Sequence, residues 1–141
     1  MSKILLKEIP LYPTSFKVDV WIGNINELPK LFHKRYGASI EYYEGMISHN
    51  QCMDLISTDN SELKGSHRII VNMSRIVPGI VLHEMNHVIY YLSKITGVEL
   101  NYQSQEWHSY MLEYLFNECM KKDFKIIEDE NIKKTTKARG A

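Results

Sequence analysis

The feature that most constrains this chain is the segment His83-Glu84-Met85-Asn86-His87, which has the form His-Glu-x-x-His. Its flanks, residues 77–82 and 88–95, are apolar with helical periodicity, so the segment is expected to lie within one continuous helix. Residues four apart lie one turn above each other on one helix face, so His83 and His87 can reach a single metal ion. Zinc is the expected ion, because it favours nitrogen ligands and a tetrahedral shell.

Glu84 is expected to be the general base of this centre. It points about 100° round the helix from His83, where it can touch a metal-bound water more easily than it can ligate the metal. The helix is apolar nearly all round, which predicts that it is buried. Buried histidines and a buried glutamate need partners, and a metal ion is the simplest one.

A catalytic zinc needs a third protein ligand and an open fourth position. The metzincin spacing is excluded, because Ser93 and Tyr90 stand where that pattern requires a histidine and a glycine. The preferred candidate is Glu106, in the first turn of a second amphipathic helix that follows a stop at Gly97. His108 is the rival third ligand.

With Glu106 as third ligand, the arrangement resembles the gluzincins, the small phage-type metallopeptidases and, more loosely, the ImmA/IrrE group. The resemblance covers roughly residues 68–118. It implies an α+β, minimal zincin-like fold: a small twisted mixed sheet packed on the active-site helix, a backing helix and a second metal-ligand helix. It also implies that residues 68–73 form the edge strand that holds extended substrate by backbone pairing. The alternative is an ordinary core strand.

Tyr110 follows Glu106 by four residues and therefore shares its helix face. As a catalytic residue it would orient Glu106 by a hydrogen bond or stabilise an oxyanion. The alternative is a packed tyrosine with an exposed hydroxyl.

The remaining elements are expected in the order strand, helix, strands, metal helix, second helix. Strands are predicted at 15–21, 38–48, 51–58 and 67–73, and the first is expected to be half-buried. A helix follows a cap at Asn24 and stops at Gly37. The metal helix begins after a cap at Ser74 or at Pro78, and the second helix covers 104–121. Residues 1–14 are interpreted as a lead-in broken by prolines.

The composition predicts one domain over residues 1–127, followed by a charged, flexible tail over 128–141. The 141 residues carry equal numbers of basic and acidic side chains, so a nucleic-acid or anionic-membrane partner is not expected. Cys52 and Cys119 lack zinc-site spacing, which favours a reduced, cytoplasmic setting. For a phage-encoded chain, that setting is the host cytoplasm or the virion.

These features together predict a zinc-dependent peptidase that acts on a protein or peptide substrate. His83, His87 and Glu106 bind Zn²⁺, and Glu84 moves the proton. The alternative is a zincin-like binding module, a virion component or regulatory partner, that keeps the metal but has lost turnover. A purely structural zinc site is the weaker third possibility, because it leaves Glu84 without a role.

Overall fold

A five-stranded mixed sheet forms the centre of the computed structural model, which describes residues 3–12, 14–23, 28–37, 51–55 and 68–127. Its strand order is β3-β4-β2-β1-β5. β2 and β4 are parallel, and the other neighbouring pairs are antiparallel. The strands are β1 (Ile4–Pro10), β2 (Lys17–Ile22), β3 (Gln51–Leu55), β4 (Arg68–Met73) and β5 (Lys125–Ile127).

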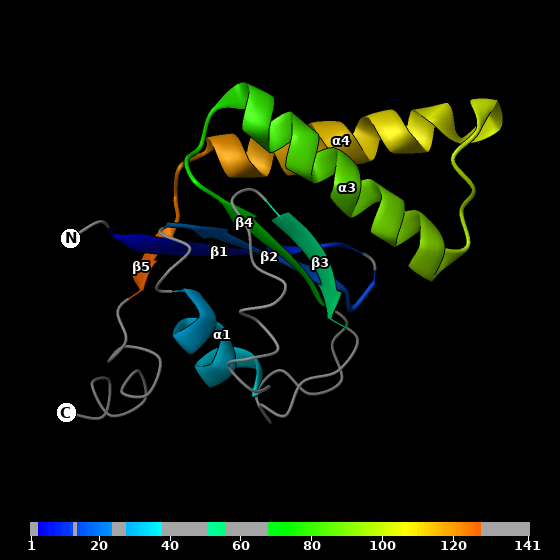
Figure 1. Cartoon of the computed structure of the whole chain (residues 1–141). Coiled ribbons are helices and arrows are strands. Elements are labelled where there is room, and N and C mark those ends of the chain that lie inside the picture. Colours follow the sequence, from blue (N-terminus) through cyan, green and yellow to red (C-terminus); the bar gives the residue numbers. More distant parts are fainter. Residues whose placement is uncertain (1–2, 13, 24–27, 38–50, 56–67, 128–141) are drawn as a thin grey trace.

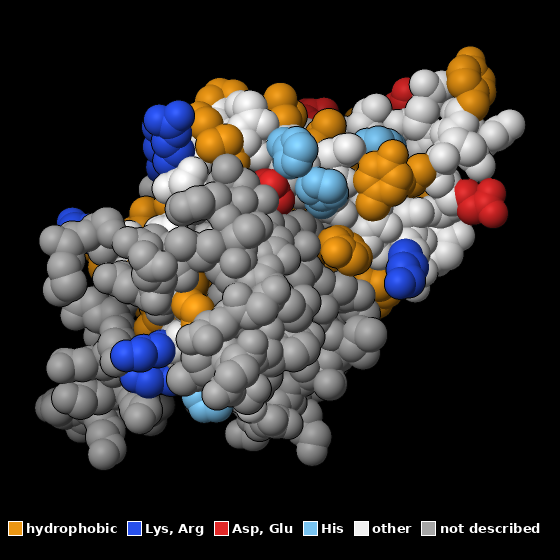
Figure 2. Space-filling model, in the orientation of Figure 1, with side chains coloured by type: hydrophobic (Ala, Val, Ile, Leu, Met, Phe, Trp, Pro, Cys, Tyr) orange, Lys and Arg blue, Asp and Glu red, His pale blue; other side chains and the backbone are white. Residues whose placement is uncertain are grey.

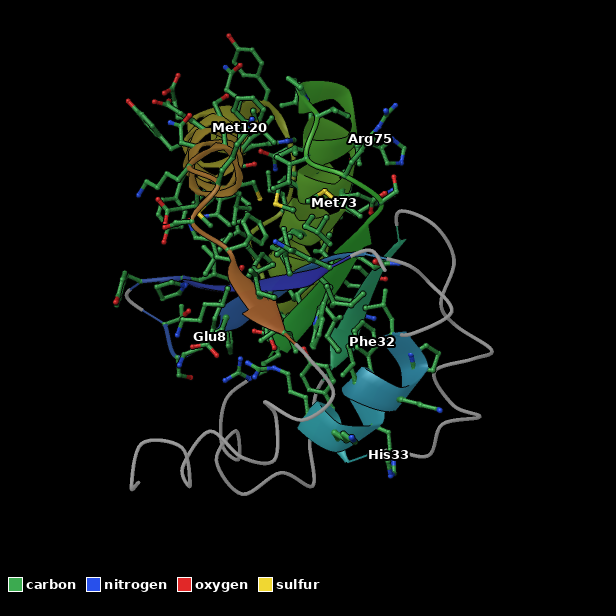
Figure 3. All side chains as sticks on the ribbon, turned by 90° about the vertical axis from the view of Figure 1, so that its left-hand side faces the viewer. Glu8, Phe32, His33, Met73, Arg75 and Met120 are labelled. Atoms are coloured by element: carbon green, nitrogen blue, oxygen red, sulfur yellow. The ribbon has the colours of Figure 1, made fainter. Side chains whose placement is uncertain are left out.

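Helices cover both faces of this sheet (Figure 1). α1 (Leu28–Tyr36) lies on one face, and α3 (Pro78–Thr96) and α4 (Gln105–Met120) lie together on the other. In the side view of Figure 3, Phe32 lies on the α1 side of the sheet and Met73 on the α3 side. The predicted α+β class is confirmed. Among the described residues, no helix combines the length and apolar character needed to cross a bilayer.

Strand β2 shows why the sheet has two cores. Val18, Val20 and Ile22 pack against α3 and α4, whereas Trp21 packs against α1. The alternation predicted from the sequence is therefore present, but the expectation of a half-buried strand is wrong. Even Asp19, on the Trp21 side, is fully buried, because α1 covers that face.

Strand β4 lies in the interior of the sheet rather than at its edge. It pairs with β2 on one side and β3 on the other, and all six of its residues are buried. The expectation that residues 68–73 form the substrate-binding edge is wrong, and the alternative of a core strand holds. Strand order depends on long-range pairing, which local sequence patterns do not encode.

A network of polar and charged side chains connects α1 to the sheet. Asp19 accepts hydrogen bonds from Tyr36 (2.6 Å), Arg35 (3.0 Å) and Arg68 (2.8 Å). Arg68 also donates to Glu8, 2.6 Å away. Burial acts to raise the pKa of Glu8, but the hydrogen bond and charge of Arg68 outweigh it and lower that pKa. These donors and acceptors satisfy the buried Asp19 carboxylate.

The ends of α3 follow from its sequence. Val77 is extended (φ −131°, ψ 147°) and Pro78 occupies the first turn, so the helix begins at the proline rather than after Ser74. Gly97, in the left-handed region at φ 76°, ends the helix and donates its N–H to the Ser93 carbonyl.

A short 3-10 turn (Tyr102–Ser104) then brings the chain into α4. Asn101 and Ser104 form a reciprocal capping box there, each side chain accepting the other's backbone N–H. This short connection places α4 beside α3 on the sheet.

Two strands were not predicted. β1 falls within the segment interpreted as a lead-in, and β5 is a three-residue strand in a charged sequence. The strand predicted at 51–58 is present as β3, and Gly37 ends α1 at φ 83° as expected. The strand predicted at 38–48 and the flexible tail predicted at 128–141 lie outside the described residues.

Candidate metal centre

Helix α3 presents His83 and His87 on the side opposite its core contacts. Val81, Met85 and Val88 face inward with no exposed surface, whereas the His83 side chain is 69% exposed. The prediction of a helix buried nearly all round is therefore wrong for the histidine face. The cause is that α4 and the sheet cover one side of α3 and not the other.

The two imidazoles converge. Their Nε2 atoms are 3.3 Å apart, and the ring centroids are 4.9 Å apart with the planes inclined by 72°. With Zn–N bonds of about 2.0–2.1 Å, this separation corresponds to an N–Zn–N angle of about 104–111°, close to tetrahedral. The pair therefore fits two positions of a zinc shell, as the i, i+4 spacing predicts.

Glu84 lies beside this pair, one residue after His83 on α3. The residue is 1% exposed, and its Oε1 is 3.9 Å from His83 Nε2. Its other oxygen, Oε2, has no hydrogen-bond partner within the described ranges. Burial raises the pKa of the Glu84 carboxyl, and the nearby His83 opposes this only in part. A buried carboxylate oxygen without a hydrogen-bond partner is costly, which makes Glu84 a candidate for a functional group.

Glu84 and His83 line the same hollow. Among the described residues, Gly79, Ile80, His83 and Glu84 line this space of about 310 Å³. Figure 2 shows histidine side chains gathered on this surface, over the α3 ribbon of Figure 1, with an acidic side chain next to them. A small molecule or a peptide carbonyl entering the hollow would meet both side chains.

The structure does not bring Glu106 to the histidine pair. Within the part of the chain that is described, no group of three His, Cys, Asp or Glu side chains is arranged to hold a metal ion. Glu106 is exposed in the first turn of α4. The buried residues of that helix, Leu115 and Cys119, lie about 180° and 220° round from Glu106 at 100° per residue. Glu106 therefore lies on the outer face of α4.

His108 of α4, unlike Glu106, contacts α3. Its Nε2 is 3.0 Å from Oδ1 of Asn86, the residue before His87. The sequence contained a signal for this placement, because His108 falls on the same helical stripe as Leu115 and Cys119. Tyr110 shares the outer face with Glu106 and is 67% exposed.

Of the three remaining histidines, His33 is the one that the structure describes, and it is not part of this group. His33 lies on α1, on the opposite side of the sheet (Figure 3). His49 and His67 lie outside the described residues.

Comparison with protein-family models, curated proteins and solved structures finds no match for the chain. The assignment of a function therefore rests on the geometry of His83, His87 and Glu84.

Proposed function

We propose that the chain is a zinc-dependent peptidase whose centre is built on α3. The observation that carries this proposal is one arrangement: two imidazole nitrogens 3.3 Å apart, next to a buried carboxylate oxygen without a hydrogen-bond partner. The first two groups are zinc ligands by type and separation. The third is a proton acceptor, which a purely structural zinc site would not use.

His83 and His87 hold the zinc through Nε2, as neutral imidazoles. Bound zinc supplies a Lewis-acidic centre that acidifies a water molecule and polarises a peptide carbonyl. Glu84 accepts the proton of the attacking water and returns it to the leaving amine. Its raised pKa makes it a stronger base than an exposed glutamate, which suits this task.

The third ligand from α4 is a separate part of the proposal. Glu106 was predicted from spacing, but it lies on the outer face of α4, so ligation would require that helix to turn. His108 lies against α3 without any such movement. Zinc affinities of Glu106→Ala and His108→Ala, measured by chelator competition, distinguish the two. The variant that removes a ligand should lose at least about 100-fold in affinity, beyond the 10–100-fold typical of outer-shell partners.

Substrate binding by strand addition would use β3 rather than β4. Within the described segments, β3 pairs only with β4, and its backbone lies against α3. An extended peptide pairing along the other side of β3 would lie near α3, which contacts β3.

The peptidase proposal is tested with Glu84→Gln. Gln has nearly the same shape but is not a base, so the variant should keep zinc and lose hydrolysis of a peptide library by about 100-fold or more. Glu113→Gln, an exposed position on α4, is the matched control and should stay active. Equal activity of wild type and Glu84→Gln, both loaded with zinc, would overturn the mechanism.

The alternative of a silent binding module gains support from one observation. Only two ligands come together among the described residues, and His83 is largely open to solvent. Such a module would bind zinc and a peptide without hydrolysing it. Zinc-loaded wild type with no turnover, but with Glu84-independent peptide binding, would favour this alternative.

A further inference from the structure

A second hollow lies between α3 and α4, one helical turn from the histidine pair. It has a volume of about 350 Å³ and is separate from the space beside Glu84. Tyr90, on the same face of α3 as His83 and His87, forms one wall. The rise from His87 to Tyr90 is about 4.5 Å. An extended peptide advances about 3.3 Å per residue, so this hollow is one to two residues from a carbonyl at the histidine pair.

The walls of this hollow have a defined chemistry. Tyr90, Leu100 and Leu112 contribute apolar surface, and polar groups come from Asn101, Gln105, His108 and Ser109. No Asp, Glu, Lys or Arg is among the described residues that line it. A charged substrate side chain would lose hydration there without meeting an opposite charge, which disfavours it.

His108 gives the hollow a hydrogen-bond acceptor. Asn86 Oδ1 can only accept, so His108 Nε2, 3.0 Å away, donates to it. In the neutral ring this leaves the lone pair on Nδ1, the other ring nitrogen. His108 lines the hollow, and we assign this lone pair as its acceptor. With the aromatic and aliphatic walls, an acceptor suits a ring that carries a hydroxyl.

We propose that the α3–α4 hollow is a specificity pocket that receives a tyrosine side chain of the substrate. The ring packs against Tyr90 and Leu112, and the hydroxyl donates to Nδ1 of His108. In this arrangement His108 keeps its hydrogen bond to Asn86 and is not the third zinc ligand. The pocket rests on the proposed peptidase function, because its position has meaning only relative to a bond held at His83 and His87.

The test uses the full-length, zinc-loaded protein and mixtures of acetylated, amidated hexapeptides. In each mixture one position in turn is fixed as Tyr, Phe, Leu, Ala, Lys or Glu. We expect one position, within two residues of the cleaved bond, at which Tyr is cleaved roughly tenfold or more faster than Ala, and Lys and Glu slower than Ala. Phe should fall between Tyr and Ala, because it lacks the hydroxyl.

Two variants test whether the preference for Tyr arises in the α3–α4 hollow. Ser109→Trp fills the hollow from an exposed position and should reduce the Tyr-to-Ala ratio to within about threefold. Asn117→Trp places the same side chain at an exposed position of α4 outside the hollow and should keep the ratio. Melting temperatures of both variants confirm that they fold.

Binding of the same mixtures to zinc-loaded Glu84→Gln provides a readout without turnover. Cleavage with no Tyr preference, or a preference that Ser109→Trp leaves unchanged, would overturn the pocket and leave the peptidase standing. Tyr-selective binding that Ser109→Trp removes, without cleavage by wild type, would overturn the peptidase and show the hollow to be the tyrosine-binding pocket of a silent binding module. Neither cleavage nor selective binding would overturn both.

Discussion

Two polar clusters lie on opposite sides of the sheet, and they differ in how their charges are satisfied. On the α1 side, the buried carboxylate of Asp19 accepts hydrogen bonds from Tyr36, Arg35 and Arg68. On the α3 side, the equally buried carboxylate of Glu84 has an oxygen with no partner among the described residues. The environment lowers the pKa of Glu8 in the first cluster and raises that of Glu84 in the second.

The difference indicates two roles for buried charge. A carboxylate whose two oxygens both accept hydrogen bonds, as in Asp19, holds one arrangement of helix and sheet, and removing a member of the cluster leaves the others unpaired. Only Nε of Arg68 has no partner among the described residues of this cluster. A buried carboxylate with one oxygen that accepts no hydrogen bond makes the fold less stable, and such groups are found where chemistry requires them. These contacts favour a structural role for Asp19, and for Glu84 they favour its role in the proposed metal centre.

Removing Asp19, the centre of the cluster on the α1 side, should have the largest effect on the free energy of unfolding. Asp19→Ala leaves Arg68 buried with one fewer acceptor, and we expect a loss of about 3–5 kcal/mol in the free energy of unfolding. Urea denaturation measures it. Lys17→Ala, which breaks a partly exposed pair with Glu8, is the control and should cost less than about 1 kcal/mol. A loss for Asp19→Ala as small as that of the control would contradict the structural role.

In the cluster on α3, the largest effect of a substitution should be on zinc affinity. His83→Ala and His87→Ala each remove one of two converging nitrogens, so zinc affinity should fall by at least about 100-fold, above the effect of outer-shell partners. Competition with a chromophoric chelator measures the affinity. His33→Ala, on the opposite side of the sheet, should bind zinc as the wild type does. Undiminished affinity in either α3 variant would show that the metal lies elsewhere.

Glu84→Gln should raise the stability of the zinc-free protein. A carboxyl whose pKa is raised by folding binds its proton more tightly when folded, so stability falls as pH rises from its ordinary value of 4.5 through the raised one. Each unit of pKa corresponds to about 1.4 kcal/mol. Urea unfolding between pH 4 and 8 should show this fall in wild type and a smaller one in the variant. A variant less stable than wild type at pH 7 would place Glu84 with Asp19, as a structural carboxylate.

The smallest effect is expected from His83→Ala in the absence of zinc. Its side chain is 69% exposed, so the free energy of unfolding should change by no more than about 0.5 kcal/mol. Met85→Ala, two residues away and fully buried, is the contrasting variant and should cost about 2–5 kcal/mol. Comparable losses in the two variants would show that the histidine face packs against something in the folded chain.

Local patterns in the sequence predicted the helices well. The apolar periodicity of residues 77–95 predicted α3, and the i, i+4 spacing of His83 and His87 predicted that their rings meet. Pro78 and Gly97 marked the helix ends, because each has a backbone preference that operates without tertiary contacts. The alternation of Val18 and Val20 likewise predicted β2.

The parts that sequence did not predict depend on contacts between distant segments. β4 is interior because β3 pairs along its outer side, and Asp19 is buried because α1 covers that face. The prediction of Glu106 rests on its distance from His87 along the chain, but the packing face of α4 decides which side chain meets α3. The stripe through His108, Leu115 and Cys119 carried that information.

The most direct measurement is anomalous diffraction at the zinc edge from crystals grown with one equivalent of zinc. We expect one peak per chain, about 2.0–2.1 Å from Nε2 of both His83 and His87, with Glu84 near the peak but not ligating it. The same map identifies the third ligand as Glu106, His108 or another group. A peak away from α3, or a peak that contacts only one of the two histidines, would contradict the proposed metal centre.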